Sequence, residues 1–365
     1  MEICFNKLSG LALLRRARVS GSIAYAEVCG LPDPDSSPQS RWTSRMIPHD
    51  LLGMDGPPTP SSKVFVAVPS SGLRPKASFF STTVYSRGTP AGSFLQLSDS
   101  LVIPCPELLF VELANVMHPA VHELLGYELC GSYARNAANP RCGNIEHGLP
   151  SVTSVDSIRE FVGRCGQING KRRALRALEN ICDNAWSSME SLCALFMRRA
   201  PDQLGYGFGN VQLNVREETS HELVSRGCKA SRVPDIVLVD HPIGFNYDGY
   251  DHLDLNSILK VIDSPTELKR KLEEIRRKYV DDRKRDRELA ARGRIVMPII
   301  SEDLSSPYGL DTVVIEALMT SEQLGGPPRE GALPDATWED ETVRARQELI
   351  QSLLPWGYGK SLGPF

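Results

Sequence analysis

The stretch of sequence that decides the fold runs from Val233 to Gly293. It begins Val233-Pro-Asp-Ile-Val-Leu-Val239 and, after a short break, continues Ile243-Gly-Phe-Asn-Tyr-Asp-Gly249. Both segments are short apolar runs, which predicts two neighbouring strands. A charged helical pattern follows and leads into a third apolar run, Ile295-Val-Met-Pro-Ile-Ile300. With a further strand expected from Val211 onward, the order strand, loop, strand, strand, helix, strand predicts an α/β core.

Polar side chains stand at the ends of the two central strands. Asp235 enters the first strand, and Asn246 and Asp248 leave the second. A hairpin would bring the three to one end of the sheet. Hydrolysis of a phosphodiester uses a metal ion to polarise the phosphate and activate water, and Mg²⁺ takes a few carboxylates together with water and substrate oxygens. The pattern therefore predicts a half-open Mg²⁺ site. The alternative is that Asp235 is a polar strand-edge residue and Asp248-Gly249 an ordinary turn.

The helix before the last strand has a defined start and a basic face. Ser264 is a candidate N-cap, Pro265 suits the first helical position, and Glu267 stands at the reciprocal capping position. The helical apolar pattern predicts a buried stripe made of Leu268, Leu272, Ile275 and Tyr279. The basic residues left for solvent or for phosphate include Lys269, Arg270, Arg276, Arg277 and Lys278. Phosphate contacts of this kind are salt-sensitive and carry little sequence information. A solvated helix face is the alternative.

Four motifs in this part of the chain point to one family. Ser187-x-x-Glu190 lies in a predicted helix, and Pro234-Asp235 opens the first central strand. Asn246-Tyr-Asp-Gly249 is followed by His252. The pattern Asp-x-x-Arg-x-x-x-Leu-x-x-x-Gly is filled by Asp282, Arg285, Leu289 and Gly293. With these motifs, residues of about 186–304 resemble the very-short-patch-repair-like endonucleases, a branch of the restriction-endonuclease-like PD-(D/E)xK superfamily.

The resemblance implies a restriction-endonuclease-like core, a mixed sheet flanked by helices, that binds DNA and cuts it with Mg²⁺. It implies that Asp235 and Asp248 are metal ligands and that Glu190 is a third ligand or positioning acid. His252 would be a proton carrier, and Arg285 would contact phosphate or pair with Asp282. From its spacing alone, Glu190 could instead complete a helix capping box with Ser187. More faintly, residues 60–135 are similar to regions beside such nuclease modules in bacterial proteins related to abortive-infection antitoxins.

One residue departs from the family pattern. Asn246 stands where the family has a glutamate, so one anionic metal ligand becomes a neutral amide. An amide oxygen can still coordinate Mg²⁺, but it neutralises less charge, and weaker metal binding is expected. Two alternatives to an active endonuclease follow. One is a non-catalytic protein of a bacterial defence or toxin–antitoxin system that binds DNA or a protein partner. The other is a structural module in which these acids serve only as caps and turns.

The remainder of the chain suggests how the domains are arranged. At 365 residues it is long enough for two domains with substantial cores. Pro/Ser-rich composition and turn signals divide it into four predicted parts. These are an N-terminal helix and linker (1–62), a smaller α+β domain (63–150), the restriction-endonuclease-like domain (151–310) and an acidic tail (311–365).

Charge and cysteine content limit the possible binding partners and the cellular compartment. Residues 260–294 hold thirteen Lys/Arg and eight Asp/Glu, whereas residues 301–342 hold ten acids and one arginine. A basic element followed by an acidic segment indicates either polyanion binding or two solvated faces of opposite sign. Nine cysteines without a Cys-x-x-Cys pair are typical of a reduced, cytoplasmic protein. We expect no signal peptide and no membrane span. The sequence leaves the oligomeric state open.

Overall fold

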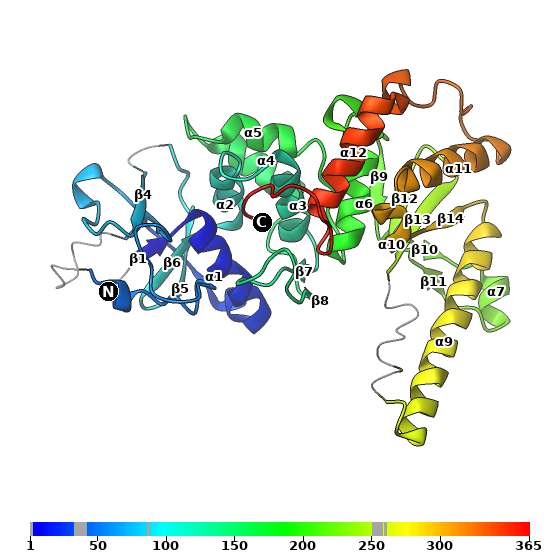
Figure 1. Cartoon of the computed structure of the whole chain (residues 1–365), viewed down its shortest axis with the longest axis horizontal. Coiled ribbons are helices and arrows are strands. Elements are labelled where there is room, and N and C mark those ends of the chain that lie inside the picture. Colours follow the sequence, from blue (N-terminus) through cyan, green and yellow to red (C-terminus); the bar gives the residue numbers. More distant parts are fainter. Residues whose placement is uncertain (1–2, 33–41, 86–87, 250–257, 259–260) are drawn as a thin grey trace. The chain divides into compact units, whose positions relative to one another are not determined.

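The computed structural model describes residues 3–32, 42–85, 88–249, 258 and 261–365. The chain forms two compact units, Met1–Ser191 together with Ser361–Phe365, and Leu192–Lys360. Figure 1 shows mixed sheets flanked by helices, as the sequence predicted. The division between the units differs from the predicted boundaries. The first unit is larger than the expected 63–150 domain because it also takes in residues 1–62 and 151–191.

A six-stranded sheet organises the first unit. Its order is β2-β5-β6-β1-β3-β4, with parallel pairing between β1 and β6 and between β3 and β4. The strands are β1 (Ile3–Phe5), β2 (Glu27–Cys29), β3 (Val64–Val68), β4 (Phe80–Val84), β5 (Phe94–Ser98) and β6 (Leu101–Pro104). Because β1 is an inner strand, the described residues of the range 1–62 belong to this unit, and residues 33–41 of the predicted linker lie outside the described residues. Residues 94–104 form two strands, since Asp99-Ser100 makes a turn between β5 and β6.

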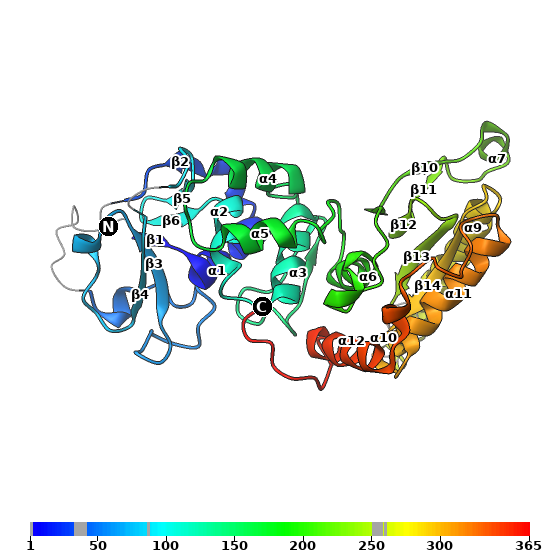
Figure 2. The same cartoon turned by 90° about the horizontal axis from the view of Figure 1, so that it is seen from above.

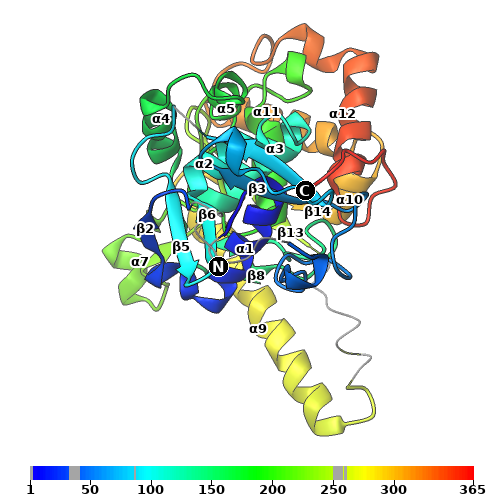
Figure 3. The same ribbon diagram turned by 90° about the vertical axis from the view of Figure 1, so that its left-hand side faces the viewer.

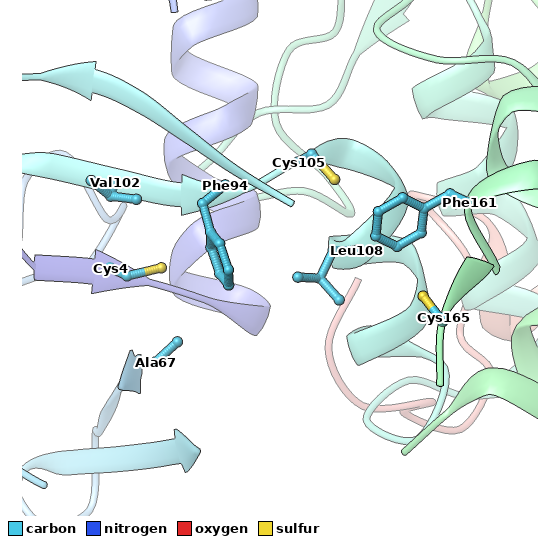
Figure 4. Packing of buried hydrophobic residues seen from close by; sticks show 8 residues of the cluster. All are labelled: Cys4, Ala67, Phe94, Val102, Cys105, Leu108, Phe161 and Cys165. Atoms are coloured by element: carbon cyan, nitrogen blue, oxygen red, sulfur yellow. The ribbon is translucent and has the colours of Figure 1, made fainter. Parts of the chain in front are cut away.

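Helices complete the first unit. They are α1 (Lys7–Ser20), α2 (Pro106–Leu113), α3 (Pro119–Cys130), α4 (Val155–Arg164) and α5 (Lys171–Ala177), with a small hairpin of β7 (Tyr133–Ala134) and β8 (Glu146–His147). Proline at the first position opens α2 and α3, where its missing N–H costs nothing. Ser154 caps α4 by accepting from the Ser157 N–H. Figure 4 shows apolar and thiol side chains from the sheet, α2 and α4 meeting in one core.

A four-stranded sheet organises the second unit. Its order is β14-β13-β12-β9: β9, β12 and β13 pair antiparallel, and β13 pairs parallel with β14. The strands are β9 (Val211–Leu213), β12 (Ile236–Leu238), β13 (Ile243–Asp248) and β14 (Ile295–Ile300). The loop before β12 holds β10 (Glu217–Glu218), α7 (His221–Ser225) and β11 (Ser231–Arg232). The helix α9 (Pro265–Ala290) joins β13 to β14, so the predicted order of elements from Val211 is the observed order.

The remaining helices of the chain are α6 (Ser188–Arg198), α10 (Ser301–Ser305), α11 (Gly309–Gln323) and α12 (Asp340–Leu353), with short 3-10 turns η1 (Ser22–Tyr25), η3 (Ser44–Met46), η4 (Ser71–Leu73), η5 (Pro201–Gln203) and η7 (Asp335–Trp338). Figure 2 shows α11 running along the sheet, and it contacts β13 and β14. The predicted acidic tail is therefore wrong for most of its length. Most acids of this segment lie on helices whose apolar sides are buried, among them Leu310, Val314 and Leu353.

Arg346 of α12 shows how firmly this segment belongs to the second unit. Its side chain is fully buried. It pairs with Asp311 of α11 and donates to the carbonyl oxygens of Leu204, at 3.1 Å, and Thr337, at 2.9 Å. Its guanidinium also lies over the ring of Tyr206, 4.3 Å from the ring centre. A buried charge with this many partners is compensated, and it fixes α12 to the rest of the unit.

An equally buried ion pair fixes α1 to α3 in the first unit. Arg15 Nε and Nη2 donate to the two carboxylate oxygens of Glu128 at 2.9 and 2.8 Å, and the side chains are 4% and 1% exposed. Arg18 donates to the Glu128 and Gly131 carbonyls beside it. Burial by itself raises the pKa of Glu128, but Arg15 outweighs it, with help from Arg135 and Arg18, and lowers that pKa below its ordinary value.

We predict that Glu128→Gln lowers the free energy of unfolding by about 3–5 kcal/mol, because Arg15 is left buried without its counter-charge. Equilibrium urea unfolding of the full chain measures this. Exposed Glu160 of α4 offers the control, since Glu160→Gln should change the value by less than about 0.5 kcal/mol.

The lowered pKa of Glu128 also fixes the sign of a pH effect. Its contribution to stability is complete above the ordinary carboxyl pKa and is lost as the pH falls toward the lower folded value. The difference in stability between wild type and Glu128→Gln should therefore shrink on acidification. A difference that grows as the pH falls would contradict the ion-pair account.

Candidate functional site

The register of the second unit's sheet brings the predicted polar residues together. In the β12–β13 pair, Ile236 lies opposite Phe245, so Asp235, one residue earlier, lies opposite Asn246. Side chains alternate along a strand, which places Asp248 on the same face as Asn246. Asp235 and Asp248 are half-buried and Asn246 is 3% exposed. Two carboxylates and one amide thus share one face at one end of the sheet.

Hydrogen bonds hold this end of the sheet in place. The Asp235 N–H donates to Asn246 Oδ1 at 3.0 Å, and the Tyr247 N–H donates to Asp235 Oδ2 at 2.8 Å. The Tyr247 hydroxyl lies 3.0 Å from Ser301 Oγ at the start of α10. The side chains of Asp235 and Asn246 therefore each satisfy a backbone N–H of the other strand's end. Asn246, the residue that departs from the family pattern, has a structural role here.

The same face is partly open at the sheet edge. Strand β14 pairs with β13 so that Pro298 lies beside Asn246 and Ile300 beside Asp248. Both Pro298 and Ile300 are exposed, Ile300 by 40%. A molecule arriving from this side can therefore approach the Asp235, Asn246 and Asp248 group without displacing a buried residue of β14.

Two predicted residues are not shown at this face. Glu190 belongs to the first unit, near the start of α6. Its N–H donates to Ser187 Oγ at 3.1 Å, and its carboxylate accepts from the Trp186 N–H at 3.2 and 3.3 Å. The bond to Ser187 Oγ is one half of the capping box that the spacing of Ser187 and Glu190 left open as an alternative, whereas the carboxylate of Glu190 accepts from the residue before Ser187. His252 lies outside the described residues.

Helix α9 brings further charges to the same face. Arg285 pairs with Asp282, at 3.5 Å, and its Nε lies 3.8 Å from Asp286. Burial raises the pKa of Asp286; Arg283 and Arg285 oppose this, while Asp248 adds to it. The influence of Asp248 on Asp286 indicates that this part of α9 lies near Asp248. Asp286 is not among the predicted site residues, although its place one helical turn after Asp282 could have indicated it.

A buried ion-pair network anchors the C-terminal half of α9. Arg232 of β11 donates to both carboxylate oxygens of Glu288, at 2.7 and 3.2 Å, and to Asp281 at 3.0 Å. Lys229 donates to the other oxygen of Asp281 at 2.7 Å. The hydrogen bonds from Arg232 lower the pKa of Glu288. This network joins α9 to β11 and to the residues just before it, and it could not be predicted from local sequence because its partners lie about fifty residues apart.

The N-terminal half of α9 is largely exposed, which corrects the predicted buried stripe. Leu272 and Tyr279 are 48% and 62% exposed, and Leu268 and Ile275 are only half-buried. The reason is length: the 26-residue helix extends about 39 Å, whereas the six residues of β14 span about 20 Å. Figures 1 and 3 show the first half of α9 extending beyond its sheet. Its exposed basic residues are Lys269, Arg270, Arg276, Arg277 and Lys278.

The donor set of the sheet face fits one kind of metal site. Within the described parts of the chain, no three His, Cys, Asp or Glu side chains form a group that could hold a metal ion. The face instead offers the carboxylates of Asp235 and Asp248 and the amide oxygen of Asn246. Mg²⁺ is commonly bound by one or two carboxylates with water and substrate phosphate. The residues therefore fit Mg²⁺ that binds together with a phosphate better than Mg²⁺ held by protein ligands alone.

Comparisons with known proteins do not assign the chain. No protein-family model matches it, and no curated protein or solved structure is significantly similar to it. A search for membrane spans found, over the described residues, no helix that combines the length and the apolar character needed to cross a bilayer.

The Asn246 amide gives a direct test of this site's local structure. We predict that Asn246→Ala exposes the Asp235 amide to solvent exchange and lowers the stability of the second unit by about 1–3 kcal/mol, because a backbone donor loses its acceptor. Hydrogen exchange of the β12 and β13 amides measures this. Asn246→Asp keeps an acceptor oxygen and should retain the protection. Equal protection in Asn246→Ala and wild type would contradict the assigned role.

Proposed function

We propose that the second unit binds DNA and hydrolyses phosphodiesters with Mg²⁺. The observation that carries the proposal is the placement of Asp235, Asn246 and Asp248 on one half-open sheet face. Helix α9, with its exposed basic residues, passes near Asp248 of that face. Carboxylates for a metal beside cations for phosphate are what phosphodiester hydrolysis requires.

Each residue group has a distinct task in this proposal. Asp235 and Asp248 would hold the metal, and Asn246 would add its amide oxygen while keeping the Asp235 N–H satisfied. Bound Mg²⁺ would polarise the phosphate and lower the pKa of the attacking water. Arg285 is positioned by Asp282 and Asp286 on the side of α9 that lies near Asp248. Glu190 and His252 stay predictions, as third acid and proton carrier.

Phosphate contacts along α9 would orient the DNA. Arg276, Arg277 and Lys278 are exposed on consecutive positions of the helix. The buried pairing of Arg232 with Glu288 anchors the helix, so these cations project from a fixed base. Binding of this kind is electrostatic and independent of sequence, because it releases counterions from the phosphate backbone.

A second candidate is a DNA- or partner-binding protein of a bacterial defence or toxin–antitoxin system that does not cut. One observation favours it. Asn246 both lacks the family's carboxylate and already accepts the Asp235 N–H at 3.0 Å. A site with two carboxylates neutralises less of the metal's charge than one with three. A cytoplasmic location belongs to both candidates as a proposal, as does an additional protein partner.

Cleavage of supercoiled plasmid in Mg²⁺ separates the two candidates. We expect slow nicking by the wild type, loss in Asp235→Ala, and faster nicking in Asn246→Asp, which adds a carboxylate without adding volume. Asn246→Glu restores the family's residue at greater length. Thermal unfolding of each variant verifies that it is folded. No nicking in wild type, Asn246→Asp and Asn246→Glu, all folded, would reject the nuclease proposal.

DNA binding is tested without cleavage, in Ca²⁺, on a dumbbell duplex that has no free ends. We predict that replacing Arg276, Arg277 and Lys278 together by Ala reduces the slope of log affinity against log salt by about three. A matched control replaces exposed Lys63, Arg74 and Lys76 of the first unit. Equal slopes in the two triple variants would reject α9 as the phosphate contact.

A further inference from the structure

The first unit contains a polar cavity that the proposed function does not use. Its volume is about 310 Å³, and its walls come from the end of β4, the end of α2 and the loop between α4 and α5. Tyr85, Glu112 and Asn115 contribute polar groups to the lining. Tyr85 and Ile168 of the wall pack against the core that is shown in Figure 4. The walls are therefore supported by buried side chains of both the sheet and the helices.

A buried carboxylate lines this cavity. Glu112 is 5% exposed. Its Oε1 accepts from Asn6 Nδ2 at 2.7 Å and from the Tyr85 hydroxyl at 2.5 Å, and its Oε2 accepts from the Lys7 N–H at 3.1 Å. A carboxylate offers about four acceptor positions. Three of them are occupied, so Glu112 can accept one more donor from a molecule in the cavity.

The environment of Glu112 differs from that of Glu128. Glu128 is buried against the guanidinium of Arg15. The groups that donate to Glu112 are an amide, a phenol and a backbone N–H, and burial raises its pKa in spite of them. A buried carboxylate without a bound guanidinium is costly to the fold, which suggests a use beyond packing. Glu112 satisfies a backbone N–H at the N-terminus of α1 by accepting from Lys7, but this bond involves only one of the two carboxylate oxygens of Glu112.

A second, basic cavity adjoins the first. It has a volume of about 720 Å³ and shares with the first the residues Asn115, Gln167, Ile168 and Asn169. Its other side chains include Lys171, Arg172, Arg173 and Arg176. The three arginines are exposed, and Lys171 donates to the Cys165 carbonyl at 2.5 Å. Arginine forks match the oxygens of a phosphate group.

We propose that these adjoining cavities bind a mononucleotide group. Its sugar hydroxyl or base amine donates to Glu112 in the inner cavity, as ribose hydroxyls donate to carboxylates in nucleotide sites. Its phosphate lies among Arg172, Arg173 and Arg176 in the outer one. The volumes fall in the usual range for small-ligand sites. The group is either a free nucleotide or the end of a nucleic-acid strand. The proposal does not depend on nuclease activity of the second unit.

Calorimetric titration of the full chain with the common ribonucleoside and deoxyribonucleoside monophosphates tests the proposal. Inorganic phosphate and a single-stranded oligonucleotide with a 5′-phosphate are the other probes. We expect at least one mononucleotide to bind tenfold more tightly than phosphate. Replacing Arg172 and Arg173 by Ala should weaken binding at least tenfold. Replacing Arg74 and Lys76, which lie on the same unit outside both cavities, should leave it unchanged.

The inner cavity is tested by Glu112→Gln and by Tyr85→Phe, each verified as folded by thermal unfolding. We expect both to reduce the preference for mononucleotide over phosphate. Tighter binding of the oligonucleotide, lost in the same variants, assigns the site to strand ends. Equal binding of phosphate and every nucleotide, or full binding in the Arg172/Arg173 variant, overturns the proposal. Neither result depends on plasmid cleavage or on α9, so this test and that of the second unit can fail separately.

Discussion

The pairing register of β12 and β13 is the constraint on which the second unit's site depends. Because side chains alternate along a strand, a slip of one residue would carry Asn246 and Asp248 to the face that now holds Phe245. Phe245 and Ile236 are fully buried on that face, so the slip would expose apolar area and bury charge. The cross-strand hydrogen bonds of Asp235 and Asn246 add local reinforcement. The apolar face thus determines where the polar residues stand.

Among the described residues, the buried contacts of helix α9 lie at one end of the helix, and this determines what kind of ligand the helix can bind. The buried contacts of Glu288 and Leu289, with Arg232 as counter-charge, lie in its last turns. The earlier turns extend past the sheet, so their basic residues meet solvent. An anchored helix that presents cations at a distance from its anchor is suited to long polyanions, whose charges repeat along their length. The exposed Tyr279 adds an aromatic surface to the same segment.

Much of the second unit's organisation follows from local sequence, whereas the domain boundaries do not. The apolar runs before and after Asp240 and the capping signals at Ser264 are local, and they predicted the strands and the start of α9. The placement of residues 1–62 depends on β1 pairing with β3 and β6, across some sixty and a hundred residues, which no local pattern reveals. The acidic segment was wrongly predicted to be a tail for a related reason. Its net charge suggested a tail, but helices α11 and α12 bury their apolar sides and the Arg346–Asp311 pair.

The site residues show the same distinction between residues that local sequence brings together and residues that meet only through packing of distant segments. Asp235, Asn246 and Asp248 were predicted to lie together because a hairpin joins them, and their register agrees. Asp286 was missed because its proximity to Asp248 depends on how α9 packs.

Asn246 is informative about both stability and chemistry. Its amide accepts a backbone N–H that a carboxylate could also accept, so the structure does not require an amide at this position. What the amide changes is charge: it does not repel Asp235 and Asp248 as a third carboxylate would when no metal is bound, and it would offer less neutralisation to a bound metal. In the proposed function, such a face would therefore take a metal that arrives together with phosphate.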